Sequence, residues 1–148
     1  MIVFIGTDHN GHNLKADIID YLHKSNINVI DTGDKQFNPD DDYPVFASRL
    51  AHQLELADDR DSFGILICGS GQGINIAANR YRHIRAALCW NVKEAHAARN
   101  DDDCNVLSLS ADSTSTDQAI QILNAFIATP FAGAPRFKRR IDELNNLP

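Results

Sequence analysis

The chain has 148 residues, of which 43% are hydrophobic and 23% are charged, and its formal net charge is −6. These values are typical of one globular domain that can bury a core, and no apolar run approaches the ~20 residues that a membrane span needs. The acidic balance argues against a nucleic-acid surface but leaves a small anionic substrate open.

The cysteine pattern indicates a reducing compartment. Cys68, Cys89 and Cys104 form neither an even disulfide framework nor a paired metal-binding motif, so we expect free thiols and no metal site. The first residues carry neither a basic leader nor a small-residue cleavage site. We therefore expect a cytoplasmic protein.

Short apolar strands alternate with helical patterns along the chain. Residues 2–7 predict a first strand, and the spacing of Leu14, Ile18 and Leu22 predicts a helix over 14–23. Further strands are expected at 28–31, 63–68, 85–89 and 105–109, and further helices at 43–56, 74–80, 93–99, 117–128 and 136–144.

This alternation requires crossover connections. It predicts a single α/β domain over residues 1–148, with a three-layer, Rossmann-like open parallel sheet of about five strands and helices on both faces. The extra C-terminal helix is expected to pack outside the sheet or against a partner subunit. Ligands of such sheets bind beyond the carboxyl ends of the strands, which directs attention to residues 7–11, residues 69–73 and the region around Asp101.

Cys68 ends the third strand and enters the glycine-rich turn at residues 69–73, which opens a helix. Backbone N–H groups and a helix N-terminus at this point favour negative charge. They predict a thiolate base or nucleophile of lowered pKa, with Ser70 beside a developing oxyanion. The alternatives are a buried cysteine that acts as a small hydrophobe, a tight turn without a ligand, and a dinucleotide loop. The last is disfavoured because the turn spells G-x-G-x-G and follows the third strand.

Two further groups could meet an anionic sugar. Asp8 and His9 follow the first strand, where they could hold hydroxyl or phosphate groups, or serve as a helix cap and an exposed imidazole. Arg136 and Arg140 are four residues apart on one helical face, where an anion would relieve their repulsion. The alternative there is a solvated basic face that the nearby acidic residues neutralise.

The ordered set of motifs resembles type B ribose-5-phosphate isomerase, a family that includes the galactose-6-phosphate isomerase subunits. The resemblance spans nearly the whole chain. The motifs that carry it are D-H-x-G at residues 8–11, Asp42-Tyr43-Pro44, C-G-S-G-x-G-x-x-I-A-A-N over residues 68–79, Asn105-Val106-Leu107, and Arg136-x-x-x-Arg140.

The resemblance implies interconversion of ribose 5-phosphate and ribulose 5-phosphate through an enediolate, without metal or cofactor. It also implies a homodimer or a dimer of dimers, with sites at the subunit interface. Cys68 would be the base, because the position of an alternative glutamate is occupied by Ile74. The implied catalytic residues are Cys68, Ser70 and Asp101, and the implied substrate-binding residues are Asp8, His9, Tyr43, Gly69, Gly71, Gln72, Gly73, Asp102, Arg136 and Arg140.

The chain departs from the family pattern at two places. Asp101 and Asp102 stand where the family has His-Asn, so Asp101 is the acid-base candidate for ring opening, with His96 as the alternative. Asp112 stands in place of a phosphate-binding arginine, and an acid there repels a phosphate. Both positions are expected to act across an interface. Two other functions therefore stay open: isomerisation of another sugar phosphate, such as a hexose 6-phosphate, and a non-catalytic sugar-phosphate-binding subunit.

Overall fold

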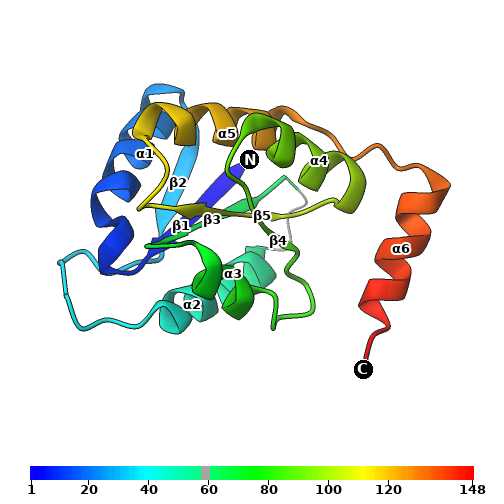
Figure 1. Cartoon of the computed structure of the whole chain (residues 1–148), viewed down its shortest axis with the longest axis horizontal. Coiled ribbons are helices and arrows are strands. Elements are labelled where there is room, and N and C mark those ends of the chain that lie inside the picture. The colour runs from blue at the N-terminus through cyan, green and yellow to red at the C-terminus, as the bar shows by residue number, and fades with distance from the viewer. Residues whose placement is uncertain (58–60) are drawn as a thin grey trace.

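A computed structural model describes residues 1–57 and 61–148 as a three-layer α/β structure (Figure 1). Its sheet is parallel throughout, in the order β2-β1-β3-β5-β4. The strands are β1 (Ile2–Thr7), β2 (Asn28–Asp31), β3 (Phe63–Cys68), β4 (Ala86–Leu88) and β5 (Val106–Ser110). The helices are the 3-10 turn η1 (His9–Gly11), α1 (His12–Lys24), α2 (Tyr43–Ala57), α3 (Gln72–Ala78), α4 (Val92–Asp102), α5 (Thr116–Ala128) and α6 (Pro135–Asn145). The predicted fold class is confirmed.

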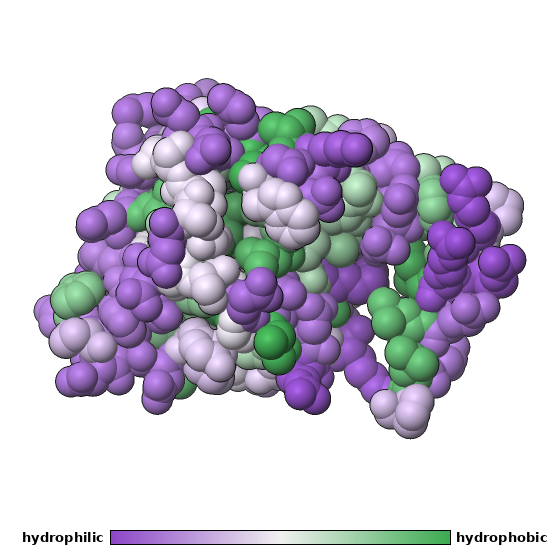
Figure 2. Space-filling model, viewed as in Figure 1, coloured by the Kyte–Doolittle hydropathy of each residue, from purple (hydrophilic) through white to green (hydrophobic). Residues whose placement is uncertain are grey.

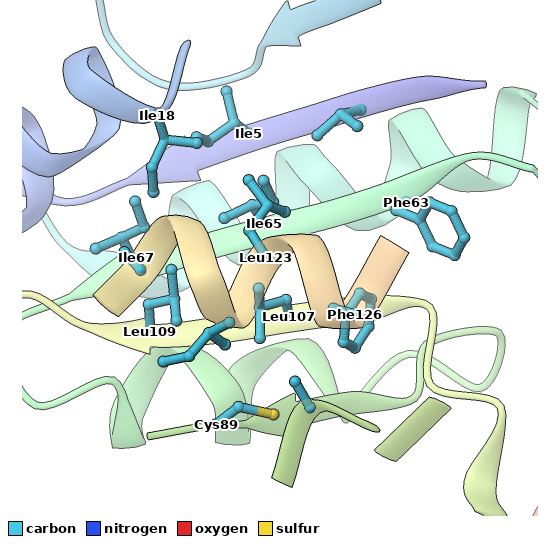
Figure 3. Close-up of a cluster of buried hydrophobic side chains, with 14 of the residues drawn as sticks. Ile5, Ile18, Phe63, Ile65, Ile67, Cys89, Leu107, Leu109, Leu123 and Phe126 are labelled. Carbon is cyan, nitrogen blue, oxygen red and sulfur yellow. The ribbon is translucent and has the colours of Figure 1, made fainter. Parts of the chain in front are cut away.

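Side chains alternate between the two faces of the sheet, as the pleat of a strand requires. On one face, residues such as Ile65 and Leu107 pack with Ile18 of α1 and with Leu123 and Phe126 of α5 (Figure 3). On the other face, a second buried cluster joins the sheet to α2 and α3. Both faces are therefore covered, which explains why β3 is apolar along its whole length.

The strand order places β1 and β3 side by side, and their following helices α1 and α3 cover opposite faces. The ends of the two strands are in register, with Thr7 opposite Ile67. The Asp8 N–H donates to the carbonyl of Ile67 at 3.4 Å. This is the switch point at which open α/β sheets bind ligands, and it joins residues 7–11 to residues 69–73.

The region around Asp101 does not lie at this edge of the sheet. It precedes β5, and the Asn105 N–H donates to the carbonyl of Arg85, the residue before β4. Because Gly64 pairs with Val106 and Cys68 with Ser110, roughly 13 Å of strand separates this region from Cys68. A segment that precedes a parallel strand lies at its amino end, so within one chain this region is distant from residues 69–73. The expectation that Asp101 acts across a subunit interface stays a prediction.

Helix α6 stands apart from the sheet and its covering helices (Figure 1). The segment that leads to it is held where the Ala132 N–H donates to the carbonyl of Asn100 at 3.1 Å, and α6 contacts α4. Its position outside the sheet was expected. None of the helices in the described ranges has the length and apolar character to cross a membrane.

Candidate active site

Cys68 is buried at the carboxyl end of β3, and the turn that follows wraps around its sulfur. Gly71 has a φ of 75°, a left-handed conformation that glycine adopts without strain, and it begins α3. This conformation directs the backbone N–H groups of Gly71, Gly73 and Ile74 toward the Cys68 sulfur. The site thus places a thiol against backbone donors, as predicted.

The pKa of Cys68 is raised, contrary to the prediction from sequence. Burial is the largest cause, because it disfavours the charged thiolate, and the carboxylate of Asp8 adds to it. The N–H groups of Ile74, Gly71 and Gly73 lower the pKa without overcoming burial. The sequence indicated the N–H donors around Cys68. It did not indicate the loss of solvation of the thiolate, which depends on how tightly α2 and α3 cover the sulfur. The resting thiol is therefore protonated at neutral pH.

Tyr43 forms a wall beside the same turn. It is the first residue of α2, and a Cβ atom placed on Gly73 would fall 2.6 Å from Tyr43 Cζ. Such a distance is too short for any real side chain at position 73. Glycine at this position is therefore what lets the tyrosine ring lie against the backbone that surrounds Cys68.

Asp8 and His9 connect β1 to the site. Asp8 Oδ1 accepts a hydrogen bond from the Asn10 N–H at 3.0 Å, so Asp8 caps η1. The capping alternative thus holds for Asp8, whose carboxyl pKa is raised chiefly by burial. His9 contacts Asp41 twice, through its backbone N–H at 2.9 Å and its ring Nδ1 at 2.7 Å. Sequence reasoning missed Asp41 because 32 positions separate it from His9 and it lies within a run of surface acids.

Gly69, at the start of the turn over residues 69–73, contacts Asp112, which was expected to act across a subunit interface. Asp112 lies in its own chain's site: its N–H donates to the Gly69 carbonyl at 3.0 Å, and a Cβ on Gly69 would fall 3.0 Å from Asp112 Oδ2. Asp112 reaches this place because it follows β5 and so emerges at the carboxyl edge of its own sheet. A role for Asp112 in a partner's site stays a prediction. Nearby, Ser70 Oγ accepts from the Gln72 N–H at 3.3 Å, at the first turn of α3.

No group of three or more His, Cys, Asp or Glu side chains in residues 1–57 and 61–148 is arranged to hold a metal ion. His9 and His12 both meet the edge of Phe37, with ring centroids 6.4 and 6.0 Å away. The three cysteines are free thiols, as the sequence predicted.

The whole pattern, from β1 to α6, matches a known family. Residues 3–144 fit the family described as ribose/galactose isomerase. The chain belongs to this family. It is 40% identical over 144 residues to ribose-5-phosphate isomerase B of Mycolicibacterium paratuberculosis, a match that covers 97% of this chain and 89% of the relative.

Solved structures of the ribose/galactose isomerase family share the fold. The structure of ribose-5-phosphate isomerase B from Mycoplasma genitalium with bound ribulose-5-phosphate has a TM-score of 0.91 and 39% identity, and the match covers 97% of this chain and 93% of that one. The ribose 5-phosphate isomerase of Thermotoga maritima has a TM-score of 0.93 and 36% identity, over 99% and 98% of the two chains.

In this member of the ribose/galactose isomerase family, the remaining predicted residues lie away from Cys68. Asp101 and Asp102 occupy the last turn of α4, and Asp102 lines a hollow together with Leu144 of α6. Arg136 stacks on Phe137, with 4.5 Å from its guanidinium carbon to the ring centroid.

Arg136 and Arg140 form no ion pair with the residues that the structure describes, whereas their neighbour Arg139 pairs with Glu143 at 3.6 Å. Each chain therefore carries two groups of predicted site residues. The first group surrounds Cys68 at the carboxyl edge of the sheet, and the second lies away from it on the end of α4 and on α6.

Proposed function

We propose that the protein interconverts ribose 5-phosphate and ribulose 5-phosphate. The observation that carries this proposal is the buried Cys68 sulfur beside the N–H groups of Gly71, Gly73 and Ile74. Aldose-ketose isomerisation needs a base for a carbon acid and fixed donors for the oxygen on which charge develops. The turn supplies both. Its relatives are named ribose-5-phosphate isomerase B, and one of them was solved with ribulose-5-phosphate.

In this mechanism Cys68 acts as a thiolate on the open-chain sugar. It takes the proton from C2, the electron pair moves into the C1–C2 bond, and the C1 carbonyl oxygen acquires the charge of the enediolate. A proton passes from the C2 hydroxyl to that oxygen, and the thiol returns its own proton to C1. Because the pKa of Cys68 is raised, its thiolate is a stronger base toward carbon, although less of it is present at neutral pH.

The first group of residues, which surrounds Cys68, holds the substrate in this proposal. The backbone at residues 69–73 and the hydroxyl of Ser70 stabilise the enediolate oxygen, and Gln72 borders the same turn. Asp8 and His9 bind substrate oxygens, and Tyr43 forms the side wall against Gly73. These roles need no metal and no cofactor.

The second group of residues completes the site of a partner copy in this proposal. Its members are Asp101, Asp102, Arg136 and Arg140. Figure 2 shows hydrophobic side chains along the side of α6 that faces the body of the molecule. Leu144 and Leu147 are among the exposed apolar residues, and a second copy packed there would bury them. It would bring its own Arg136 and Arg140 to the phosphate. We therefore propose a homodimer, alone or paired into a dimer of dimers.

Ring opening is assigned to Asp101 of that second copy, with Asp102 as a contact to the sugar. In its own chain Asp101 accepts a hydrogen bond from the Asn100 side chain at 2.7 Å. A carboxylate so held has a second oxygen that can exchange a proton with the ring oxygen. The free thiols support a reducing compartment, and we place the activity in the cytoplasm.

One observation favours a different sugar phosphate. Asp112 lies beside Gly69, where a carboxylate accepts hydrogen bonds from hydroxyl groups and repels a phosphate. An isomerase for a hexose 6-phosphate is the second candidate. Turnover measured over a panel of pentose and hexose phosphates separates the two, and ligand binding without any turnover would indicate a non-catalytic subunit.

The deciding experiment measures conversion of ribose 5-phosphate in the presence of a metal chelator. We expect turnover by the native protein and its loss in Cys68→Ala and Cys68→Ser. The matched control is Cys89→Ala, which removes a buried thiol from the cluster on the opposite face of the sheet and is expected to keep activity. A folded native protein without turnover contradicts the proposed substrate, and full activity in both Cys68 variants contradicts the proposed base.

A further inference from the structure

His9 is held by a residue to which the sequence assigned no role. A single carboxylate oxygen, Asp41 Oδ1, accepts from both the backbone N–H of His9 and its ring Nδ1, at 2.9 and 2.7 Å. The Asp41 side chain is only 9% exposed, compared with 30% for His9. Two bonds to one buried oxygen fix both the position and the rotation of the imidazole.

Asp41 is itself anchored in the segment between β2 and α2. Its N–H donates to the Asn38 carbonyl at 3.3 Å, and the Asp40 N–H donates to the Asn38 side chain at 3.1 Å. The ring of Phe37, from the same segment, meets His9 edge-on. The segment thus supports one side of the imidazole.

This arrangement decides which ring nitrogen is free. Nδ1 faces Asp41, so Nε2 points to the opposite side of the ring, where it makes no hydrogen bond with the described residues. A neutral imidazole with its proton on Nδ1 offers a bare acceptor at Nε2, whereas the protonated ring offers an N–H donor. The charge on His9 therefore determines whether it can bind an anionic oxygen.

The charged groups around His9 favour the protonated ring. The carboxylate of Asp8 lies at the end of β1, and those of Asp40 and Asp41 lie in the segment before α2. The ring of His12 also contacts Phe37. The pKa of His9 is raised, chiefly by its hydrogen bond to Asp41 and then by the negative charges of Asp8, Asp41 and Asp40, against some loss of solvation.

The geometry points to Asp41 as a positioning residue that holds His9 with Nε2–H available to the phosphate of the bound sugar. This inference rests on the proposed function, because it uses the same site and the same substrate class. His9 makes the anion contact within one chain, and Asp41 acts only through its two bonds to His9. A charge-assisted hydrogen bond of this kind is stronger than a neutral one.

The test compares Asp41→Asn with the native protein. Asparagine keeps the shape and an acceptor oxygen but removes the charge, so we expect the pKa of His9 to fall. The KM for ribose 5-phosphate should rise by about tenfold near pH 7.5, which is the scale of one charge-assisted hydrogen bond. We expect kcat to stay within about twofold and the difference in KM to vanish near pH 5.5, where His9 is protonated in both proteins.

The matched control is Asp40→Asn, which removes a neighbouring charge without touching the ring, and its KM profile should move much less. A KM profile of Asp41→Asn that superimposes on the native one overturns the inference. So does a loss confined to kcat, because a positioning role in anion binding predicts a change in KM.

A second measurement does not depend on turnover. Titration of the His9 ring by nuclear magnetic resonance in the native protein should give a pKa above the ordinary value of about 6.5, and added inorganic phosphate should raise it further. An ordinary His9 titration that phosphate does not move overturns the inference, even if Asp41→Asn fails to fold. Failure of the proposed function gives a different result: no turnover of ribose 5-phosphate by a protein whose His9 still responds to phosphate.

Discussion

The ring of Tyr43 lies against the backbone of Gly73, so closely that an added Cβ would fall 2.6 Å from Tyr43 Cζ. We expect Gly73→Ala to push the exposed tyrosine ring out of the site. The unfolding free energy should fall by about 1 kcal/mol or less, because the ring can move into solvent, whereas the KM should rise severalfold. Steady-state kinetics and denaturant unfolding measure the two effects.

Gly64, a glycine within strand β3, offers the contrast. A Cβ on Gly64 would fall 2.6 Å from Leu50 and 2.9 Å from Val106 in the core. Gly64→Ala should therefore cost about 1–3 kcal/mol of stability and leave the KM unchanged. An unchanged KM in Gly73→Ala would show that Tyr43 does not border the substrate.

The raised pKa of Cys68 predicts an activity that increases with pH. The thiolate is the active form, and burial shifts its appearance above the ordinary pKa of a thiol. We therefore expect kcat to climb through the neutral and weakly alkaline range. The ultraviolet absorbance of the thiolate, taken as native protein minus Cys68→Ser, should follow the same curve. A thiolate that forms well below the ordinary range would contradict the dominance of burial.

Cys89 and Cys104 predict a loss of stability in alkali. Burial raises the pKa of each from 9.0 to about 12. Above pH 9 the unfolded chain loses these protons while the folded chain keeps them, so the folded state binds more protons and stability falls as pH rises. Each thiol contributes a slope of up to about 1.4 kcal/mol per pH unit. Denaturant unfolding of Cys104→Ala should show a shallower decline than the native protein, and parallel curves would refute the assignment.

The negative charge of Asp112 beside Gly69 is expected to weaken the binding of anions at the start of the turn. Removing its charge in Asp112→Asn should strengthen inhibition by inorganic phosphate by about fivefold at low salt, and by less at high salt, as expected for about 1 kcal/mol of screened repulsion. Asp117→Asn, in the first turn of α5, is the control and should change little. Equal inhibition constants for Asp112→Asn and the native protein would separate Asp112 from the anion site.

The separation of the two groups of site residues within each chain predicts complementation between chains. Cys68→Ala and Arg140→Ala should each be nearly inactive alone, because every site in each homodimer lacks one essential side chain. Random exchange of subunits produces hetero-dimers with one intact site, so the mixture should recover up to ~25% of native activity. A mixture as inactive as its parents would place Arg140 outside a shared site.

Much of the fold follows from local pattern. The bounds of β1, β2 and β3 agree with the prediction because apolar runs end at turn-forming residues. Helix α4 continues to Asp102, beyond the predicted end at residue 99, and stops where Asp103 takes a left-handed φ of 48°. Its last turn has no apolar periodicity to reveal it, so Asp101 and Asp102 lie on a helix end.

The sequence by itself determined the alternation of strands and helices, the thiol at the end of β3 and the donors in the turn after it, because these depend on residues close together in the chain. Only the tertiary structure decided the pKa of Cys68, the bond between Asp41 and His9, the place of Asp112 in its own chain's site and the separation of Asp101 from Cys68. Burial and long-range contacts are set by how the layers pack and by the direction of each parallel strand, and neither is written in a local motif.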